Sequence, residues 1–379
     1  MSLIPCQRHR FDIPREIAYL NTAYMSPLSH DVIAALARGA RMKARPWTLS
    51  IPDFYDAPDR ARALFAGLVG ADAAGVALVP SASYGVETAA RNLTVGPGER
   101  VVMLADQFPS HVYPWRRAVR ATGGEVLAVS PPPGEAATEA LLAAIDERCA
   151  VAALPNVLWT TGAVIDLAAI RNRCDEVGAA LVLDLTQSAG AMATDFAAIR
   201  PDFAVVAAYK WLLGPYATGL LYVAPHRRGG EPLEEGWIAR KGSRNFSALV
   251  EYTDEYEPGA LRFDMGERAN FALMPGLVAA LEMLTEWGPA ATEATLKAQT
   301  AGIGARIAAL GLEPMPESAR GPHFLTAALP ADAPEDLLAR LAAAGVHLSI
   351  RGGALRITPH LWNDEADADK LIEALGAAL

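Results

Sequence analysis

The sequence predicts an α/β protein with a mostly parallel, seven-stranded sheet covered by helices on both faces, plus a smaller α+β domain. Short apolar runs alternate with helical patterns from residue 76 onward. Such alternation is typical of a parallel sheet with helices on both faces. The runs that predict strands are residues 76–80, 101–105, 125–130, 151–156, 180–185, 203–209 and 219–224.

The remaining elements follow from the same patterns. Helices are expected over residues 83–93, 110–121, 137–147 and 166–178. Residues 225–265 are polar and rich in turn residues, which indicates a loop-rich excursion. Beyond it we expect helices at 272–287 and 291–310, strands at 323–328, 346–349 and 354–358, and a helix after residue 363.

Three parts of the chain are expected from this pattern. Residues 1–30 form an N-terminal segment that packs on the small domain and on the functional site. Residues 31–260 form the large domain, which carries that site. Residues 261–379 form the small C-terminal domain.

The composition excludes several classes of protein. The net charge of −10 and the pI near 5.3 argue against nucleic acid or an anionic membrane as a partner. No apolar run approaches the ~20 residues of a membrane span, and the start of the chain lacks a signal-peptide core. Cys6, Cys149 and Cys174 lack metal-ligand spacing, so no metal site is expected. We expect a cytoplasmic protein.

Lys210 and Asp184 point to a specific chemistry. Each ends an apolar run, and the two runs predict consecutive strands of one sheet. Taken singly, Lys210 fits an exposed loop residue and Asp184 fits a helix N-cap. A buried lysine, however, has a lowered pKa and becomes an amine nucleophile. Together the amine and the carboxylate suit pyridoxal phosphate, because the amine holds its aldehyde and the carboxylate keeps its ring nitrogen protonated.

Two further segments are expected at the same edge of the sheet. Residues 80–85 turn from a strand into a helix, and a helix N-terminus with small hydroxyl residues can bind phosphate. Ser81 or Ser83 also fits an ordinary N-cap. Phe108 begins the next segment, where an aromatic ring can stack on a pyridine ring or simply belong to the core.

Several motifs resemble the class V aminotransferase family of the fold-type I pyridoxal-phosphate superfamily, which includes cysteine desulfurases, kynureninases and isopenicillin N epimerase-like proteins. The most specific are Leu183-Asp-Leu-Thr-Gln-Ser-Ala-Gly190 and Tyr209-Lys210. Supporting matches include residues 19–23, 76–87, 108–113, 155–158 and 355–360. The resemblance covers nearly the whole chain.

The resemblance implies a role for each matching residue. Lys210 would carry the coenzyme as a Schiff base, Asp184 would pair with the ring nitrogen, and Gln187 would hydrogen-bond the phenolic oxygen. The residues implied for the phosphate are Ala82, Ser83 and Tyr209, and the residue implied for stacking on the ring is Phe108. Arg356 would hold the substrate carboxylate in a bidentate pair, and the further residues implied at the coenzyme or substrate are Asn156 and Asn21.

The resemblance also implies a homodimer with its active sites at the subunit interface. In relatives, a residue just after a glycine in the stretch matching 263–270 reaches the other subunit's phosphate. Here Gly266 is followed by Glu267 and Arg268. Arg268 and Asn270 are the two candidates, and Arg268 is carried forward as a cofactor-binding residue.

The function expected from the resemblance is a pyridoxal-phosphate-dependent reaction at the α-amino group of an amino acid, with transamination favoured. The alternatives are epimerisation of the isopenicillin N type, a kynureninase-like reaction or a C–S lyase. No cysteine lies between Gly345 and Arg356, which argues against a cysteine desulfurase. A catalytically silent regulator is disfavoured because Lys210 and Asp184 are both present. Nicotinamide binding is disfavoured because no G-x-G-x-x-G follows the first strand.

The expected substrate is a neutral amino acid. Arg356 is the one arginine that the resemblance assigns to a carboxylate, and no second obvious cation is available for a side-chain acid. Arg351, Arg268 and Arg262 remain unplaced by the sequence.

Overall fold

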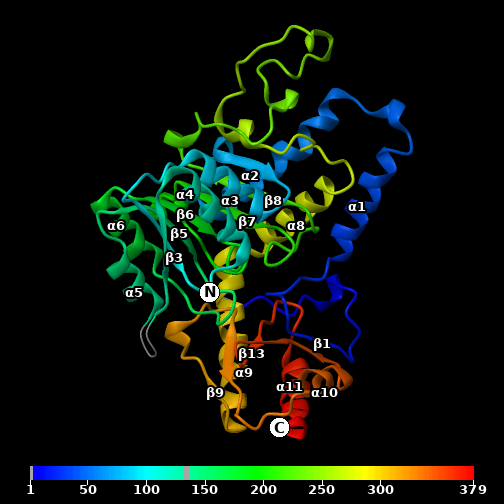
Figure 1. Ribbon diagram of the computed structural model, residues 1–379. Coiled ribbons are helices and arrows are strands. Elements are labelled where there is room, and N and C mark those ends of the chain that lie inside the picture. The colour runs from blue at the N-terminus through cyan, green and yellow to red at the C-terminus, as the bar shows by residue number, and fades with distance from the viewer. Residues whose placement is uncertain (1–2, 132–135) are drawn as a thin grey trace.

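A seven-stranded sheet forms the centre of the computed structural model, which describes residues 3–131 and 136–379 (Figure 1). The strand order is β2-β8-β7-β6-β5-β3-β4, and only β8 runs antiparallel to its neighbours. The strands are β2 (Val76–Val79), β3 (Arg100–Leu104), β4 (Glu125–Val129), β5 (Cys149–Pro155), β6 (Ala180–Asp184), β7 (Phe203–Ala207) and β8 (Gly219–Val223). The predicted sheet is confirmed, and each strand starts within two residues of its expected start.

Both faces of this sheet are buried. Along β2, Val76 and Leu78 pack into one apolar cluster, whereas Ala77 and Val79 pack into another on the opposite face. Alternate residues of a strand point to opposite faces, so the continuous apolar runs of the sequence follow from burial on both sides. The helices after these strands are α3 (Ala82–Asn92), α4 (Tyr113–Thr122), α5 (Ala137–Ala144), α6 (Leu167–Val177) and the short α7 (Phe196–Ile199).

Two helices that the sequence patterns did not predict lie before the sheet. They are α1 (His30–Met42) and α2 (Asp56–Val69), and both pack against α8 (Met274–Trp287). In Figure 1, the segment between α1 and α2 and the excursion after β8 extend away from the sheet as two arms. Among the described residues, 225–273 contain short 3-10 turns but no strand or α-helix, which agrees with the expected loop-rich excursion.

The second unit contains a four-stranded antiparallel sheet with strand order β12-β13-β10-β9, and this confirms the predicted smaller α+β domain. Its strands are β9 (Glu313–Pro314), β10 (Leu325–Ala328), β12 (Ser349–Arg351) and β13 (Ala354–Ile357). Its helices are α9 (Pro289–Ala309), α10 (Leu337–Ala343) and α11 (Glu365–Ala378). The expected boundary at residues 260 and 261 stays a prediction.

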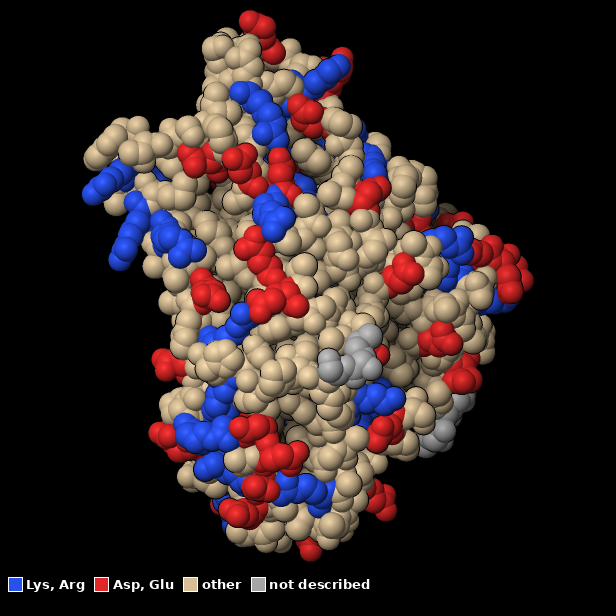
Figure 2. Space-filling model, turned by 180° about the vertical axis from the view of Figure 1, so that it is seen from behind, with Lys and Arg blue, Asp and Glu red and all other residues tan. Residues whose placement is uncertain are grey.

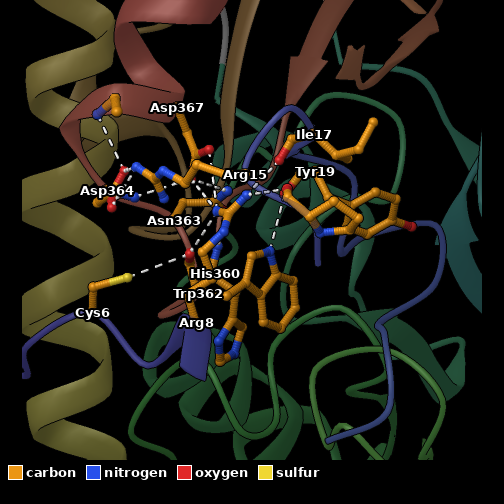
Figure 3. Close-up of polar contacts among 12 residues, drawn as sticks. Cys6, Arg8, Arg15, Ile17, Tyr19, His360, Trp362, Asn363, Asp364 and Asp367 are labelled. Atoms are coloured by element: carbon orange, nitrogen blue, oxygen red, sulfur yellow. Dashed lines mark hydrogen bonds and ion pairs between the residues drawn. The ribbon is translucent and has the colours of Figure 1, made fainter. Parts of the chain in front are cut away.

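The N-terminal segment is held against the small domain (Figure 3). Its strand β1 (Ala18–Tyr19) pairs in parallel with β11 (Val346–His347). Arg8 forms an ion pair with Asp367 at 2.9 Å, and Arg15 pairs with Asp364 at 2.6 Å. These contacts fix the chain just before Asn21. Residues 1 and 2 of the expected N-terminal part lie outside the described residues.

The surface carries charges of both signs. Figure 2 shows Lys and Arg interspersed with Asp and Glu over much of one face. Within residues 3–131 and 136–379, no helix is long and apolar enough to cross a membrane. The same part of the chain holds no group of three or more His, Cys, Asp or Glu side chains placed to bind a metal ion.

Gly190 allows the loops that carry Asp184 and Lys210 to approach closely. Its φ is +99°, a conformation that residues with a side chain rarely adopt. A Cβ atom at this position would overlap the carbonyl oxygen of Trp211, the residue after Lys210. The glycine of the 183–190 motif therefore has a steric role beside the functional site.

We expect Gly190→Ala to destabilise the fold by about 2–5 kcal/mol, because backbone strain adds to overlap with the Trp211 carbonyl. Gly178→Ala is the matched control: its φ is +77°, but nothing lies within 4 Å of the added Cβ. The control should lose only about 1 kcal/mol. Urea unfolding of the two variants measures the difference, and equal midpoints would refute the steric role.

Candidate active site

A cavity of ≈ 370 Å³ lies at the carboxyl ends of β6 and β7. Asp184 is the last residue of β6 and is paired with Val205 of β7, while Lys210 follows the end of β7. Both side chains line the cavity. The parallel register thus brings together the carboxylate and the amine that the sequence placed on neighbouring strands.

The Lys210 amine is strongly desolvated. Only 7% of the residue is exposed, and burial lowers its pKa to about 8, an effect that Asp184 opposes and that Arg356 and Arg351 reinforce. Its Nζ lies 5.4 Å from the centroid of the Phe108 ring. A lower pKa leaves more of the amine unprotonated at neutral pH, and the unprotonated amine is the nucleophile.

The N-terminus of α3 borders the same cavity. Ser81 is its N-cap and accepts the Tyr84 N–H at 3.2 Å, which confirms that Ser81 caps this helix. Ala82 and Ser83 line the cavity, and the Ser83 hydroxyl donates to Ser110 at 2.8 Å. The first N–H groups of a helix lack partners within the helix, so this end of the cavity suits a phosphate.

Aromatic side chains form the walls. Phe108 contacts Trp159 edge to face, with ring centroids 5.5 Å apart, and Tyr209 packs against Tyr216 at 4.8 Å. All four residues line the cavity. The walls are therefore mostly apolar, which strengthens the electrostatic interactions of the few charged groups inside.

Gln187 forms two hydrogen bonds with the surrounding protein. Its Nε2 donates to the Ala23 carbonyl at 3.1 Å, and its Oε1 accepts the Trp211 indole N–H at 3.0 Å. An amide nitrogen carries two hydrogens, so one remains for a ligand in the cavity that Gln187 lines. This geometry is compatible with the expected contact to a phenolic oxygen.

Arg356 projects from the small domain toward the cavity wall. Its Nη1 donates to the Trp159 carbonyl at 2.6 Å, and its Nε donates to the Ser349 hydroxyl at 2.9 Å. Ser349 in turn donates to Asn21 Oδ1 at 3.1 Å. Asn21, expected to bind substrate, thus fixes Arg356 through Ser349. Three of the five guanidinium N–H groups remain, which is enough for a carboxylate.

Comparison with known protein families identifies the family to which the chain belongs. Residues 41–359 match the family described as Aminotransferase class-V. The chain belongs to the aminotransferase class-V family. Proteins of this family depend on pyridoxal phosphate. The resemblance inferred from the 183–190 and 209–210 motifs is therefore confirmed.

Similar proteins of the class-V family include enzymes with different names. A kynureninase of Deinococcus radiodurans is 32% identical over 271 residues, which are 69% of this chain and 64% of that protein. A probable cysteine desulfurase of Methanothermobacter thermautotrophicus is 27% identical over 295 residues, or 74% of this chain and 70% of that one. The chain thus spans less than two thirds of the kynureninase.

A solved structure has the same fold. It is a mutant of C-DES with glycine covalently linked to its PLP cofactor, and it matches with a TM-score of 0.87 and 18% identity. The match covers 98% of this chain and 100% of that one. At this identity the likeness establishes the fold of this class-V member and nothing more.

The residues of the cavity fit the coenzyme of the class-V family. They supply an amine for its aldehyde at Lys210, a carboxylate for its ring nitrogen at Asp184 and a helix N-terminus for its phosphate at Ala82 and Ser83. The buried, partly neutral Lys210 is the state that such a site needs before the coenzyme binds. Tyr209 and Phe108 lie on the same walls.

Two of the expected site residues, Asn156 and Arg268, are not among the residues that line the cavity. Asn156 is buried directly after β5, and its neighbours Pro155 and Val157 line the cavity. Arg268 is 1% exposed and pairs with Asp264 at 2.6 Å. Their functional assignments stay predictions.

Arg268 belongs to a buried ion-pair cluster. Asp264 also pairs with Arg62 at 2.6 Å and accepts the Leu78 N–H at 2.8 Å. The cluster ties the excursion after β8 to α2 and β2. Arg268 thus has a structural role in the described chain, apart from any contact across a subunit interface.

His111 lies near the site, but the sequence motifs gave it no role. It is fully buried, and burial lowers its pKa to about 4, although Asp184 opposes the shift. Gln107 Nε2 lies 2.7 Å from His111 Nδ1, while Gln107 Oε1 accepts the Phe108 N–H. This arrangement places the proton of the neutral ring on Nε2, which has no hydrogen-bond partner among the described residues. The only sequence signal was its place in the matched stretch 108–113.

We expect apoprotein to bind pyridoxal phosphate covalently through Lys210. The rate should rise with pH, reach half its maximum near pH 8 and level off above that, because the pKa is lowered from 10.5 to about 8. Borohydride trapping followed by peptide mass spectrometry measures both the site and the rate. Lys241→Ala, which removes a lysine with a side chain 65% exposed, is the control and should change neither. An adduct on another lysine, or a half-maximal rate near the ordinary lysine value of 10.5, would contradict this assignment.

Proposed function

We propose that this chain is a pyridoxal-phosphate-dependent enzyme that cleaves the bond between the β-carbon of an amino acid and its substituent. The buried Lys210 amine beside Asp184 carries the proposal. Bound pyridoxal phosphate supplies an electron sink that stabilises negative charge at the α-carbon. The sequence patterns favoured transamination, whereas the similarity to a kynureninase and to a cysteine desulfurase favours cleavage.

Each charged residue has a part in this reaction. Arg356 holds the α-carboxylate and so orients the α-carbon next to Lys210. Lys210 Nζ, as the free amine, removes the α-proton and becomes an ammonium group. The electron pair of the broken C–H bond forms a double bond between the α- and β-carbons, and the β-substituent leaves with its own bonding pair. The aromatic walls exclude water while this charge moves.

Asp184 maintains the electron sink. It is 8% exposed, and one carboxylate oxygen accepts the Thr186 N–H at 2.9 Å, which fixes the direction of the other. A fixed carboxylate beside the ring nitrogen favours the protonated ring.

A persulfide mechanism on a protein thiol is not proposed. Residues 349–357 form a tight hairpin through Gly352 and Gly353 and contain no cysteine. Cys149 and Cys174 are buried, and burial raises the pKa of their thiols to about 11 and about 12. Cys6, in the N-terminal segment, lies beside α9, with its Sγ 3.4 Å from the Trp362 carbonyl (Figure 3). None of the three is placed to accept sulfur at Lys210.

We also propose that the enzyme acts as a homodimer. The two arms seen in Figure 1 expose large apolar side chains: Trp47 is 79% exposed, Val250 is 75% exposed and Tyr252 is 91% exposed. Exposed apolar groups on projecting segments are typical of surfaces that bind another protein chain. A second copy of the chain would cover them.

We expect Asp184→Asn to retain coenzyme but to lose about 10²–10⁴-fold in the rate of α-proton exchange. The amide keeps the shape of the side chain but cannot hold the ring nitrogen protonated, and loss of a buried charge partner costs roughly 3–5 kcal/mol. Deuterium exchange at the α-carbon, followed by NMR, measures the rate. Asp106→Asn is the control, since Asp106 is exposed. Exchange at the parental rate in Asp184→Asn would refute the role of the charge.

The reaction type is tested by measuring product formation when no keto acid is added as an acceptor of the amino group. We expect the holoenzyme to release a free β-substituent and a three-carbon product from suitable amino acids when no keto acid is added. Chromatography with mass detection identifies both products. Turnover only when a keto acid is supplied would mean transamination, and loss of optical activity without cleavage would mean epimerisation.

A further inference from the structure

Arg351 and Arg356 lie on the same face of the β12–β13 hairpin. Ser349 is paired with Arg356, and Arg351 is paired with Ala354. Side chains two residues apart along a strand point to the same face, so both arginines and Ser349 share one face. Diagonal neighbours of this kind lie about 7–8 Å apart at Cβ.

This face is turned toward the cavity. Arg356 donates to the carbonyl of Trp159, and Thr326, its partner across the strand pair, donates to the Thr161 carbonyl at 2.8 Å. Trp159 itself lines the cavity. The positive charges of Arg356 and Arg351 both lower the pKa of Lys210, in agreement with the position of this face.

Neither arginine has an acidic partner in the part of the chain that the structure describes. The ion pairs within 4.0 Å there include neither Arg351 nor Arg356. Arg351 donates only to the carbonyl of its own neighbour, Ile350. Arg356 is just 2% exposed, and a buried charge is costly unless it is paired.

The other arginines that the sequence left unplaced are accounted for. Arg268 is paired with Asp264. Arg262 lies over the Tyr256 ring at 4.5 Å and donates to the Gly230 carbonyl. Of these three arginines, Arg351 is the one that shares the hairpin face with Arg356.

We propose that the substrate carries a second anionic group that Arg351 binds while Arg356 binds the α-carboxylate. The substrate class is then an amino acid whose β-substituent leaves with its bonding pair and itself carries a carboxylate or a comparable oxyanion. This inference rests on the proposed function, which assigns the α-carboxylate to Arg356. It replaces the neutral donor expected from the sequence.

The charge balance of the site supports this substrate class. Lys210 and Asp184 line the cavity, and Arg351 and Arg356 lie on the hairpin face that contacts its Trp159 wall. The phosphate of the coenzyme is expected at the other end, beside Ala82 and Ser83. A substrate with two anionic groups brings the charges on the small-domain side into balance, whereas a neutral side chain leaves Arg351 without a counter-ion.

Spectral titration of the holoenzyme with paired amino acids tests the proposal. The pairs are aspartate with asparagine and glutamate with glutamine, which match in size but differ in charge. We expect the acid to bind about 10–100-fold more tightly than its amide, because a hydrogen bond to a charged group is involved. In Arg351→Gln this ratio should fall to about one. Arg340→Gln, an arginine of α10 whose side chain is 50% exposed, should keep the parental ratio.

Each other outcome has a distinct meaning. Equal binding of acid and amide by the parent protein would overturn the inference while leaving the proposed function standing. Binding of neither member of any pair would overturn the inference, whereas the proposed function is decided separately by release of the β-substituent. A change of oligomeric state in Arg351→Gln, with the acid preference intact, would mean that Arg351 contacts the second copy, and the inference would fall.

A second measurement needs no turnover. In apoprotein, Arg351→Gln removes a cation that lowers the pKa of Lys210, so the pH at which coenzyme uptake levels off should move upward. Arg340→Gln should leave it unchanged. An unchanged plateau in Arg351→Gln would show that Arg351 does not act on the cavity, and the inference would fail.

Discussion

The parallel pairing of β6 with β7 is the constraint on which the rest of the site depends. Its register sets Asp184 beside Val205, so the carboxylate lies at the same edge of the sheet as the turn that carries Lys210. The two faces of the sheet pack into different apolar clusters, so a shift by one residue would place each side chain of the strand in the cluster that does not fit it. Burial then lowers the pKa of Lys210, and Asp184 keeps that lowering moderate.

The sheet was predictable because its signal is local. Seven apolar runs and the helices between them can be recognised a few residues at a time, and burial on both faces makes the runs continuous. The helices α1 and α2 lie before the first of these runs and were not predicted, although Ser29 caps α1 and its residues Val32, Ala35 and Gly39 are buried at helical spacing. Both helices pack against α8, which is more than 200 residues away in the sequence.

The site was predictable only in part, because half of it is made by contacts between distant segments. The motif residues Lys210, Asp184 and Ser83 meet through the sheet itself. Arg356, by contrast, is fixed by Ser349 and by the Trp159 carbonyl, and Asn21 reaches it through Ser349. No spacing in the sequence reveals such a chain of contacts. The same holds for Arg268, whose buried pairing with Asp264 is invisible in the glycine-containing stretch that suggested a phosphate contact.

The burial of Arg356 without an acidic partner in the described chain favours binding of an anionic ligand. Holding a guanidinium at 2% exposure without a carboxylate costs free energy in the ligand-free protein, and an incoming anion recovers it. Arg351 is less buried than Arg356 and lies on the same face of the hairpin, next to the turn at Gly352 and Gly353. In the proposed reaction, the buried Arg356 holds the α-carboxylate and so sets the position of the α-carbon, and the more exposed Arg351 binds the second anionic group of the substrate.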